Sequence, residues 1–296
     1  VAVVKGGRSV ERQVSLVSGR ECAAALRRVG YKVSEVDAGK DLPKELDRLS
    51  PDIIFNALHG RYGEDGCVQG LFECLEIPYT HSGVQASSLA MNKDIAKRIF
   101  KSNNLPVAES ICTSSVLAFS AHLMEPPYVI KPVNEGSSVG VHLVMREDDS
   151  FPTLEKNFPD KVLVEKFIPG RELTTTIMDG QPLGVTDIIT DNWYDYESKY
   201  NLGASKHIVP ADIPKEIYDA CEDFALHAHT ALGCRGITRA DFRWDNSLGI
   251  DGLFLLEINT QPGMTPTSLS PEQAKEKGIS FDNLCNWIVE DASCNR

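Results

Sequence analysis

The stretch Leu253-Phe254-Leu255-Leu256-Glu257-Ile258-Asn259-Thr260-Gln261-Pro262-Gly263-Met264 joins a buried strand to a polar end. It opens with four consecutive apolar residues, a run too short for a helix. Glu257 and Asn259 follow two positions apart, so in a strand their side chains share one face. Pro262-Gly263 then ends the strand. A carboxylate beside an amide oxygen suits Mg²⁺, which takes oxygen ligands, although a strand end that meets water explains the same residues.

A second stretch, Gly236–Asp245, also predicts a strand with polar residues on one face. Arg239 and Asp241 have the same two-residue spacing. The turn-forming residues 245–249 predict that this strand and the one carrying Glu257 are hairpin neighbours. Two carboxylates would then converge, and like charges so close require a cation between them. Two metal ions that clamp the phosphates of a nucleotide satisfy this requirement.

Composition places the chain among ordinary globular proteins. Its 296 residues suffice for two or three domains, with 42% hydrophobic and 24% charged residues. The net charge of −12 argues against broad nucleic-acid or membrane-surface binding. None of the eight cysteines forms a C-x-x-C pair, which favours reduced thiols in the cytosol. No apolar run approaches the ~18 residues of a membrane span, and no signal peptide is visible.

The N-terminal part predicts an open parallel α/β unit. The strand Val1–Val4 leads through a glycine turn into a helix that ends near Gly30. Because Val1 already lies in the strand, we expect a few native residues to precede it. Glu11, in the first helical turn, either matches the helix dipole or faces a ligand. His59 opens a glycine-rich, charged loop after the third strand, and both a ligand-facing and a structural role are open for it.

Two lysines in the middle of the chain point to phosphates. A helix begins after Asn92, which is a suitable cap, and Lys93 lies at its N-terminus, where lysine is unfavourable for the helix. A residue that breaks a local rule is a candidate for function, although a surface lysine is equally possible. Lys131 ends a strand and is followed by the glycine- and serine-rich loop Asn134–Val141. This loop differs from a P-loop, but its backbone N–H groups can cover phosphates as a lid.

The remaining segments complete an alternation of strands and helices. The end of the strand Lys161–Gly170 can offer backbone groups to an adenine edge. Glu172–Ile177 predicts another strand, and the polar, aromatic stretch Tyr194–Tyr200 predicts a loop over a site. Helical spacing is found in Ile217–Leu232 and in Phe281–Glu290.

Five motifs, taken together and in order, resemble the D-alanine–D-alanine ligases of the ATP-grasp superfamily, essentially from end to end. They are Gly6–Glu11 with Val14-Ser15-Leu16, Ala57–Gly60 with Gly63–Gly66, Lys131-Pro132 with Glu135–Gly140, Tyr194–Tyr200, and Glu257–Thr260 with Pro262–Met264.

The resemblance implies an α/β ATP-grasp fold with three domains. These would be an open parallel α/β domain at residues 1–91 with the first amino-acid site, and two α+β domains clamping ATP, at 92–171 and, with the metal site, at 172–296. It implies a cytoplasmic homodimer that joins two D-alanines through D-alanyl phosphate, giving ADP and phosphate, for peptidoglycan precursors. The substrates would be D-alanine and ATP, with two Mg²⁺ (or Mn²⁺) as cofactors, and with no nucleic-acid or membrane partner.

The resemblance also assigns site residues. Those for ATP are Lys93, Lys131 and Ser138 at the phosphates, Glu165, Lys166, Phe167 and Ile168 at adenine, Glu172 at the ribose, and Glu257. The metal ligands would be Asp241, Glu257 and Asn259. The catalytic set comprises Glu11 for the first ammonium, Ser137 and Tyr200 linked to Glu11, Lys199 for the transferred phosphate, and Arg239 with the Gly263 N–H for the attacked carbonyl. The amino-acid sites would be completed by Val14, His59, Ser268 and Leu269.

The form of the Tyr194–Tyr200 loop resembles dipeptide-forming members and differs from the histidine-bearing loop of relatives that use D-lactate. Three positions depart from the family pattern: His81 replaces a usual glycine, Asn92 replaces a common aspartate, and Gln261 occupies a variable position. His81 leaves the fit of the amino-acid site open. The alternatives are another ATP-grasp ligase, including a D-alanine–D-lactate ligase, a regulatory module without chemistry, and a dinucleotide-dependent dehydrogenase. The dehydrogenase is disfavoured because G-x-G-x-x-G is absent.

Overall fold

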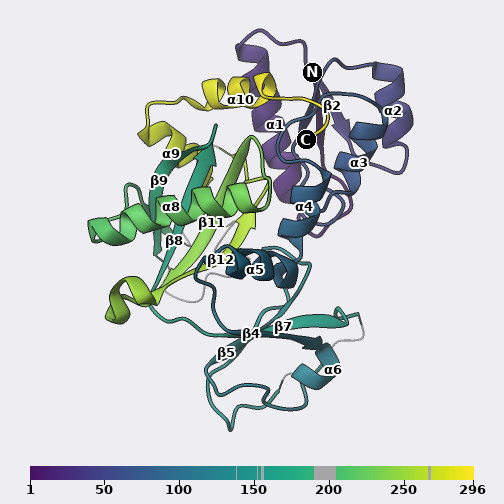
Figure 1. The fold of residues 1–296 in the computed structure, drawn as a ribbon. Coiled ribbons are helices and arrows are strands. Elements are labelled where there is room, and N and C mark those ends of the chain that lie inside the picture. The colour runs from purple at the N-terminus through teal and green to yellow at the C-terminus, as the bar shows by residue number, and fades with distance from the viewer. Residues whose placement is uncertain (138, 152, 155–156, 190–204, 266–267) are drawn as a thin grey trace.

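The computed structural model describes residues 1–137, 139–151, 153, 154, 157–189, 205–265 and 268–296. In these residues the chain forms three β-sheets with helices packed on them (Figure 1). One sheet is parallel and lies in the N-terminal third, whereas the other two are antiparallel. A parallel sheet followed by two antiparallel sheets agrees with the predicted fold class, an open parallel α/β part followed by α+β parts.

The N-terminal sheet has the order β2-β1-β3, with Ala2–Lys5 as β1, Ser34–Asp37 as β2 and Ile54–Asn56 as β3. Its helices are α1 (Arg12–Arg28), α2 (Leu42–Leu49), α3 (Cys67–Cys74), α4 (Val84–Met91) and α10 (Phe281–Glu290).

Alternation of side chains fixes the two faces of this sheet. Val3 packs with α1 and α10, whereas Ala2 and Val4 pack on the side of α2 and α3. The C-terminal helix α10 thus completes a layer begun by the first residues of the chain. In the segment 77–80, Tyr79 forms isolated bridges to Ile54 and Ser293. Pro78 has no N–H to donate to a ladder.

The central sheet has the order β4-β7-β5-β6. Its elements are β4 (Ser110–Ser114), α6 (Ser115–Ala118), β5 (Tyr128–Pro132), β6 (His142–Val144) and β7 (Lys161–Lys166). Tyr128, Ile130, Val162 and Val164 share one buried cluster with Ala118 of α6. This small core supports β5, the strand that carries Lys131.

The C-terminal sheet has the order β10-β9-β8-β11-β12. Its strands are β8 (Arg171–Met178), β9 (Gln181–Ile189), β10 (Lys206–Ile208), β11 (Ile237–Trp244) and β12 (Leu253–Asn259), with the 3₁₀ segment η1 (Asn246–Gly252) between the last two. Helices α5 (Lys93–Ser102), α8 (Lys215–Ala231) and α9 (Leu269–Glu276) contact this sheet or its edge strand.

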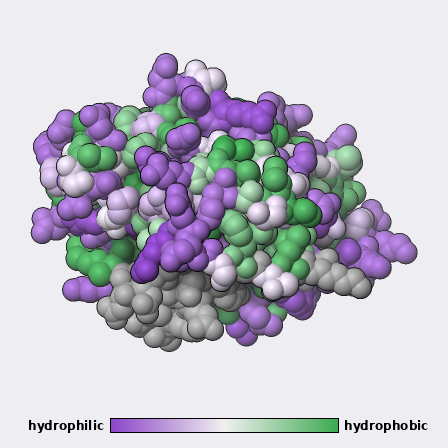
Figure 2. Space-filling view, turned by 90° about the horizontal axis from the view of Figure 1, so that it is seen from below, coloured by the Kyte–Doolittle hydropathy of each residue, from purple (hydrophilic) through white to green (hydrophobic). Residues whose placement is uncertain are grey.

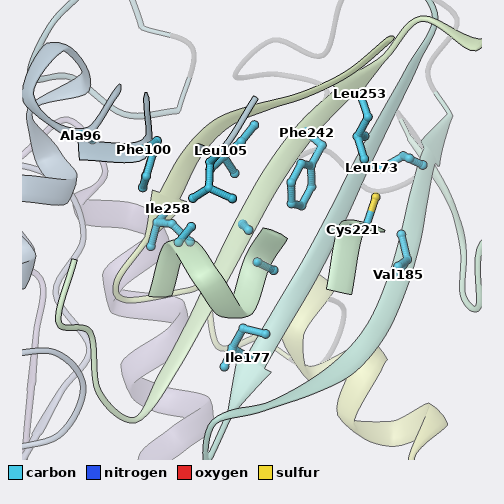
Figure 3. Packing of buried hydrophobic residues seen from close by; sticks show 14 of the residues in the cluster. Ala96, Phe100, Leu105, Leu173, Ile177, Val185, Cys221, Phe242, Leu253 and Ile258 are labelled. Carbon is cyan, nitrogen blue, oxygen red and sulfur yellow. The ribbon is translucent and has the colours of Figure 1, made fainter. Parts of the chain in front are cut away.

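The largest hydrophobic cluster connects α5 and α8 to this sheet. Figure 3 shows Phe100 of α5 near Ile258 of β12, and Cys221 of α8 near Leu173 and Val185. Because α5 carries Lys93 and β12 carries Glu257, this apolar contact sets the distance between two residues of the predicted site. Each fully buried large side chain of this kind contributes roughly 1.5–3 kcal/mol of burial free energy.

The surface seen from the end of the central sheet is mostly hydrophilic around an area of hydrophobic residues (Figure 2). Among the described residues, no helix is long and apolar enough to cross a membrane.

Candidate active site

Two adjoining cavities lie where the three sheets meet. The larger, of about 430 Å³, is lined by the loops after β1 and β3, by the N-terminus of α5, and by the segment that follows β12. The smaller, of about 100 Å³, lies between the central and C-terminal sheets. Lys93, Gly136, Ser137 and Glu257 line both cavities. A ligand in one cavity therefore lies directly beside a ligand in the other.

The structure brings the predicted site residues together. Those that line the larger cavity are Glu11, Val14, His59, Lys93, Ser137, Arg239, Glu257, Asn259, Gly263, Ser268 and Leu269. Those that line the smaller cavity are Lys93, Lys131, Ser137, Glu165, Lys166, Phe167, Ile168, Glu172, Asp241 and Glu257. The predictions for Ser138, Lys199 and Tyr200, and for the Tyr194–Tyr200 loop, lie outside the described residues.

Glu11 is enclosed from two sides in the larger cavity. It precedes α1 and is only 5% exposed, and its carboxylate accepts a hydrogen bond from the Ser137 hydroxyl. A Cβ on Gly60, whose φ is +69°, would lie 2.4 Å from Glu11 Oε2, and one on Gly136 would lie 3.3 Å from it. Both glycines therefore allow their loops to close on the carboxylate, so the position of Glu11 depends on segments of two different sheets.

Glu64 adds a second acidic group at this end of the cavity. Its Oε1 accepts a hydrogen bond from the Gly60 N–H at 2.7 Å. Burial, together with the nearby charge of Glu11, raises the pKa of Glu64 well above its usual range. The raised pKa favours the neutral form of Glu64, so the carboxylate of Glu11 supplies the negative charge that suits an ammonium group here.

The predicted hairpin pairing is confirmed. In the β11–β12 ladder Asp241 is opposite Glu257, and Arg239 is opposite Asn259. Arg239 donates to both oxygens of Asp241, at 2.8 and 2.7 Å, and Thr174 Oγ1 donates to Asp241 at 2.7 Å. This bidentate pair fixes the plane of the guanidinium.

The donor set fits Mg²⁺. Asp241, Glu257 and Asn259 provide two carboxylates and one amide oxygen from neighbouring strands, which is the oxygen chemistry that Mg²⁺ prefers. Among the described residues, no three His, Cys, Asp or Glu side chains form a metal cluster by themselves. The amide of Asn259 and the phosphates of a nucleotide would therefore be needed to complete the coordination.

Lys93 bridges the two cavities. Its Nζ lies 3.0 Å from Glu257 Oε2 and donates to the backbone carbonyl of Glu135 at 2.7 Å. Burial alone would lower the pKa of Lys93, but the charge of Glu257 and the more distant Glu165 raise it overall. The predicted cap is confirmed, because Asn92 Oδ1 accepts from Ile95 N at 3.1 Å. Lys93 is thus a charged group beside the carboxylate predicted to hold metal.

A buried charge network supports Lys131 in the smaller cavity. Glu165 is 3% exposed, and its two carboxylate oxygens accept from Lys131 and Lys97 respectively. Burial alone would raise the pKa of Glu165, but Lys131 and Lys97 lower it overall. The Glu165 side chain is thus occupied by lysines, so a contact with adenine at this position would have to come from the backbone.

The far end of the smaller cavity is fixed by Arg243, two residues beyond Asp241 on β11. Its guanidinium donates to the carbonyls of Ile168 and Gly170 at 3.0 and 3.1 Å, and lies 3.6 Å from a Glu172 oxygen. Arg243 therefore joins the turn after β7 to the carboxylate predicted to bind ribose.

His59 and His81 are both buried and uncharged at neutral pH. Burial, with a smaller contribution from Arg239, lowers the pKa of His59 to about 4. Burial lowers the pKa of His81 to about 3. His81 packs edge-on against Phe55 and is not among the described residues that line the larger cavity. His81 thus does not contact the larger cavity directly, and its φ of +70° explains why glycine suits this position.

Four charged or titratable residues in or beside the two cavities were not predicted from the sequence: Glu64, Lys97, Arg243 and His207. Spacing could have found two of them. Lys97 lies one helical turn after Lys93, and Arg243 continues the alternation of Arg239 and Asp241. Glu64 belongs to a motif whose loop was predicted to face a ligand, whereas His207 has no signal of this kind.

Comparison with known proteins agrees with this geometry. The profile of the D-ala D-ala ligase N-terminus matches residues 35–82, and that of the D-ala D-ala ligase C-terminus matches residues 99–290. The chain is 60% identical to a D-alanine–D-alanine ligase of Ruegeria pomeroyi, covering 100% of this chain and 97% of the relative. It is also 60% identical to one of Cereibacter sphaeroides (strain ATCC 17025), covering 100% and 96%.

The fold is similar to a crystal structure of D-alanine–D-alanine ligase from Bacillus anthracis complexed with ATP. The TM-score is 0.83 at 29% identity, with 98% of this chain and 96% of that chain covered. The three sheets and the paired cavities thus define an ATP-grasp protein with a nucleotide site. Within that class, the chain belongs to the D-alanine–D-alanine ligase family.

Proposed function

We propose that the chain joins two D-alanine molecules into D-alanyl-D-alanine while ATP is converted to ADP and phosphate, as a step in peptidoglycan synthesis. A carboxylate is a poor electrophile, so the donor D-alanine must first be activated. Its carboxylate attacks the γ-phosphorus of ATP and gives D-alanyl phosphate. The amine of the acceptor then attacks the carbonyl carbon, a C–N bond forms, and phosphate leaves.

The donor binds at the Glu11 end of the larger cavity. Glu11 holds the donor ammonium, and the Ser137 hydroxyl fixes the carboxylate that does so. Arg239 lines the same cavity and is held in one plane by Asp241. It donates to the carbonyl oxygen on which negative charge develops, together with the Gly263 N–H. One such donor can contribute roughly 3 kcal/mol to the transition state.

The nucleotide binds in the smaller cavity. Lys93 and Lys131 neutralise its phosphates, since phosphoryl transfer depends mainly on positioning and charge neutralisation. The backbone of residues 165–168 holds adenine and Glu172 holds the ribose. Asp241, Glu257 and Asn259 would hold the two Mg²⁺ ions, which supply charge neutralisation at the phosphates when bound. Closure of the Gly136-Ser137 loop excludes water from the acyl phosphate.

The observation that carries this proposal is the enclosure of Glu11 beside the nucleotide cavity. A buried carboxylate that two glycine loops surround, next to Lys93 and Glu257, provides an ammonium site within reach of a phosphate site. A ligase for an unrelated acid has no need of Glu11.

The test is phosphate release from Mg-ATP with D-alanine, L-alanine and D-lactate, each alone and in mixtures, with products identified by mass spectrometry. We expect release with D-alanine alone, yielding the dipeptide, and none with L-alanine. Glu11→Gln should lower the rate through the donor site. Nucleotide binding without release on D-alanine would overturn the assignment and favour another acid or amine as substrate.

The finer features belong to the same proposal. We propose a cytoplasmic homodimer whose three domains are residues 1–91, 92–171 and 172–296. Sedimentation of the purified chain tests the dimer, and titration of the metal-free enzyme with Mg²⁺ and Mn²⁺ tests the metal requirement.

A further inference from the structure

One wall of the larger cavity carries a histidine that has no role in the proposed activation of D-alanine and formation of the dipeptide. His207, on the short strand β10, lines the cavity and its side chain is 17% exposed. Its Nδ1 lies 2.7 Å from Glu272 Oε2, and its Nε2 lies 3.2 Å from Ser205 Oγ. The ring is therefore held by a carboxylate on one side and remains beside the cavity.

Glu272 ties His207 to the first turn of α9. Ser268 is the N-cap of this helix, and Glu272 N donates to the Ser268 carbonyl at 3.0 Å. Ser268 and Leu269 of the same turn line the cavity. The helix itself is fixed, because Gln273 Oε1 accepts from the backbone of Thr176 at 2.7 Å in a buried contact. The histidine thus belongs to a rigid wall.

Glu11 lines the part of the cavity where the donor ammonium binds in the proposed function. Ser268 and Leu269, at the N-terminus of α9, also line the cavity, and the first N–H groups of a helix favour the carboxylate of a second amino acid. A second amino acid bound there places its own ammonium and methyl group against the same wall. His207 is the titratable side chain that the described part of this wall offers to them.

We propose that His207, oriented by Glu272, contacts the acceptor D-alanine and sets its affinity. With the Nδ1 proton donated to Glu272, Nε2 is an acceptor that the Ser205 hydroxyl meets at 3.2 Å, and the acceptor ammonium would replace that hydroxyl as the donor to Nε2. The charge of Glu272 strengthens this bond through the ring. His207 is then a specificity residue for the acceptor, and this inference rests on the proposed function.

The test measures the Michaelis constant of the donor D-alanine separately from that of the acceptor D-alanine. Saturation of the holoenzyme with D-alanine at fixed Mg-ATP yields one constant for the donor and one for the acceptor. His207→Phe keeps a ring but removes both nitrogens. We expect the acceptor constant to rise about tenfold, the effect of one hydrogen bond to a charged group. The donor constant and the KM for ATP should stay within about twofold. His227→Phe, the same change on the exposed face of α8, should alter none of them.

Glu272→Gln supplies an independent measurement, because it keeps the size of the side chain and removes its charge. We expect a rise of about threefold in the acceptor constant, and this variant decides the question if His207→Phe does not fold. An unchanged acceptor constant in a folded variant, or an equal rise in both D-alanine constants, would overturn the inference. Absence of dipeptide formation by the unmodified chain would instead overturn the proposed function.

Discussion

Lys97 provides the most demanding test of the nucleotide site, because it touches neither cavity yet supports a residue that does. The side chains of Lys97 and Glu165 are 5% and 4% exposed, and Lys131 occupies the other oxygen of Glu165. Lys97→Met keeps the length of the side chain and removes its charge. Glu165 would then remain buried with one oxygen unpaired.

The expected cost follows from this burial. Breaking a buried ion pair by removal of one partner costs about 3–5 kcal/mol, because an uncompensated charge stays in the interior. Since Lys131 still pairs with Glu165, we expect the free energy of unfolding to fall by the lower value of this range, about 3 kcal/mol. Lys215→Met is the matched control, because Lys215 forms an ion pair with Asp219 at 85% and 51% exposure. Exposed pairs contribute about 0–1 kcal/mol.

Equilibrium urea denaturation followed by circular dichroism measures both variants. Adding Glu165→Gln to Lys97→Met should recover part of the loss, because the two residues are coupled. The KM for ATP should rise in Lys97→Met while both D-alanine constants stay unchanged. If Lys97→Met costs no more than Lys215→Met, the buried network does not stabilise the chain as argued.

Three further outcomes follow from the site. Arg239→Ala should lower kcat by about 10²–10³ with little change in the KM for ATP, as steady-state kinetics would reveal, and an effect on ATP binding alone would contradict its role at the carbonyl. His81→Phe should raise the free energy of unfolding by about 1 kcal/mol, because neither ring nitrogen of His81 has a hydrogen-bond partner among the described residues; a loss of stability on denaturation would contradict this. The pKa of His59 is about 4 in the folded chain against the ordinary 6.5, so its contribution to stability is complete above pH 6.5 and is lost as pH falls toward 4. The free energy of unfolding of His59→Gln, measured against pH, should therefore fall less steeply between pH 6.5 and 4 than that of the unmodified chain.

Local patterns were sufficient for much of the site. The two-residue spacing of Glu257 and Asn259, and of Arg239 and Asp241, predicted shared strand faces, and the turn between the strands predicted their pairing. Asn92 was predicted as a cap from its residue type and position. These predictions succeeded because strand alternation and helix capping depend on residues close in the chain.

Other contacts depend on residues far apart in the chain. The hydroxyl of Ser137 reaches Glu11 across 126 positions, and His207 meets Glu272 across 65. Lys97 lies one helical turn after Lys93, but its buried partner Glu165 is 68 positions away, so the local sequence does not show that the two residues pair. The sequence position of His81 left its effect on the amino-acid site open, whereas the structure shows that its ring packs against Phe55.

The sequence by itself determined which residue types and spacings the chain offers, and therefore its strands, its caps and the resemblance that names its family. The tertiary structure alone decided which side chains share a cavity and which charges are buried together. The physical reason is that local structure follows from neighbours within a few residues, whereas burial and long-range pairing follow from the packing of whole sheets and helices. Lys97 and His207 owe their proposed roles entirely to that packing.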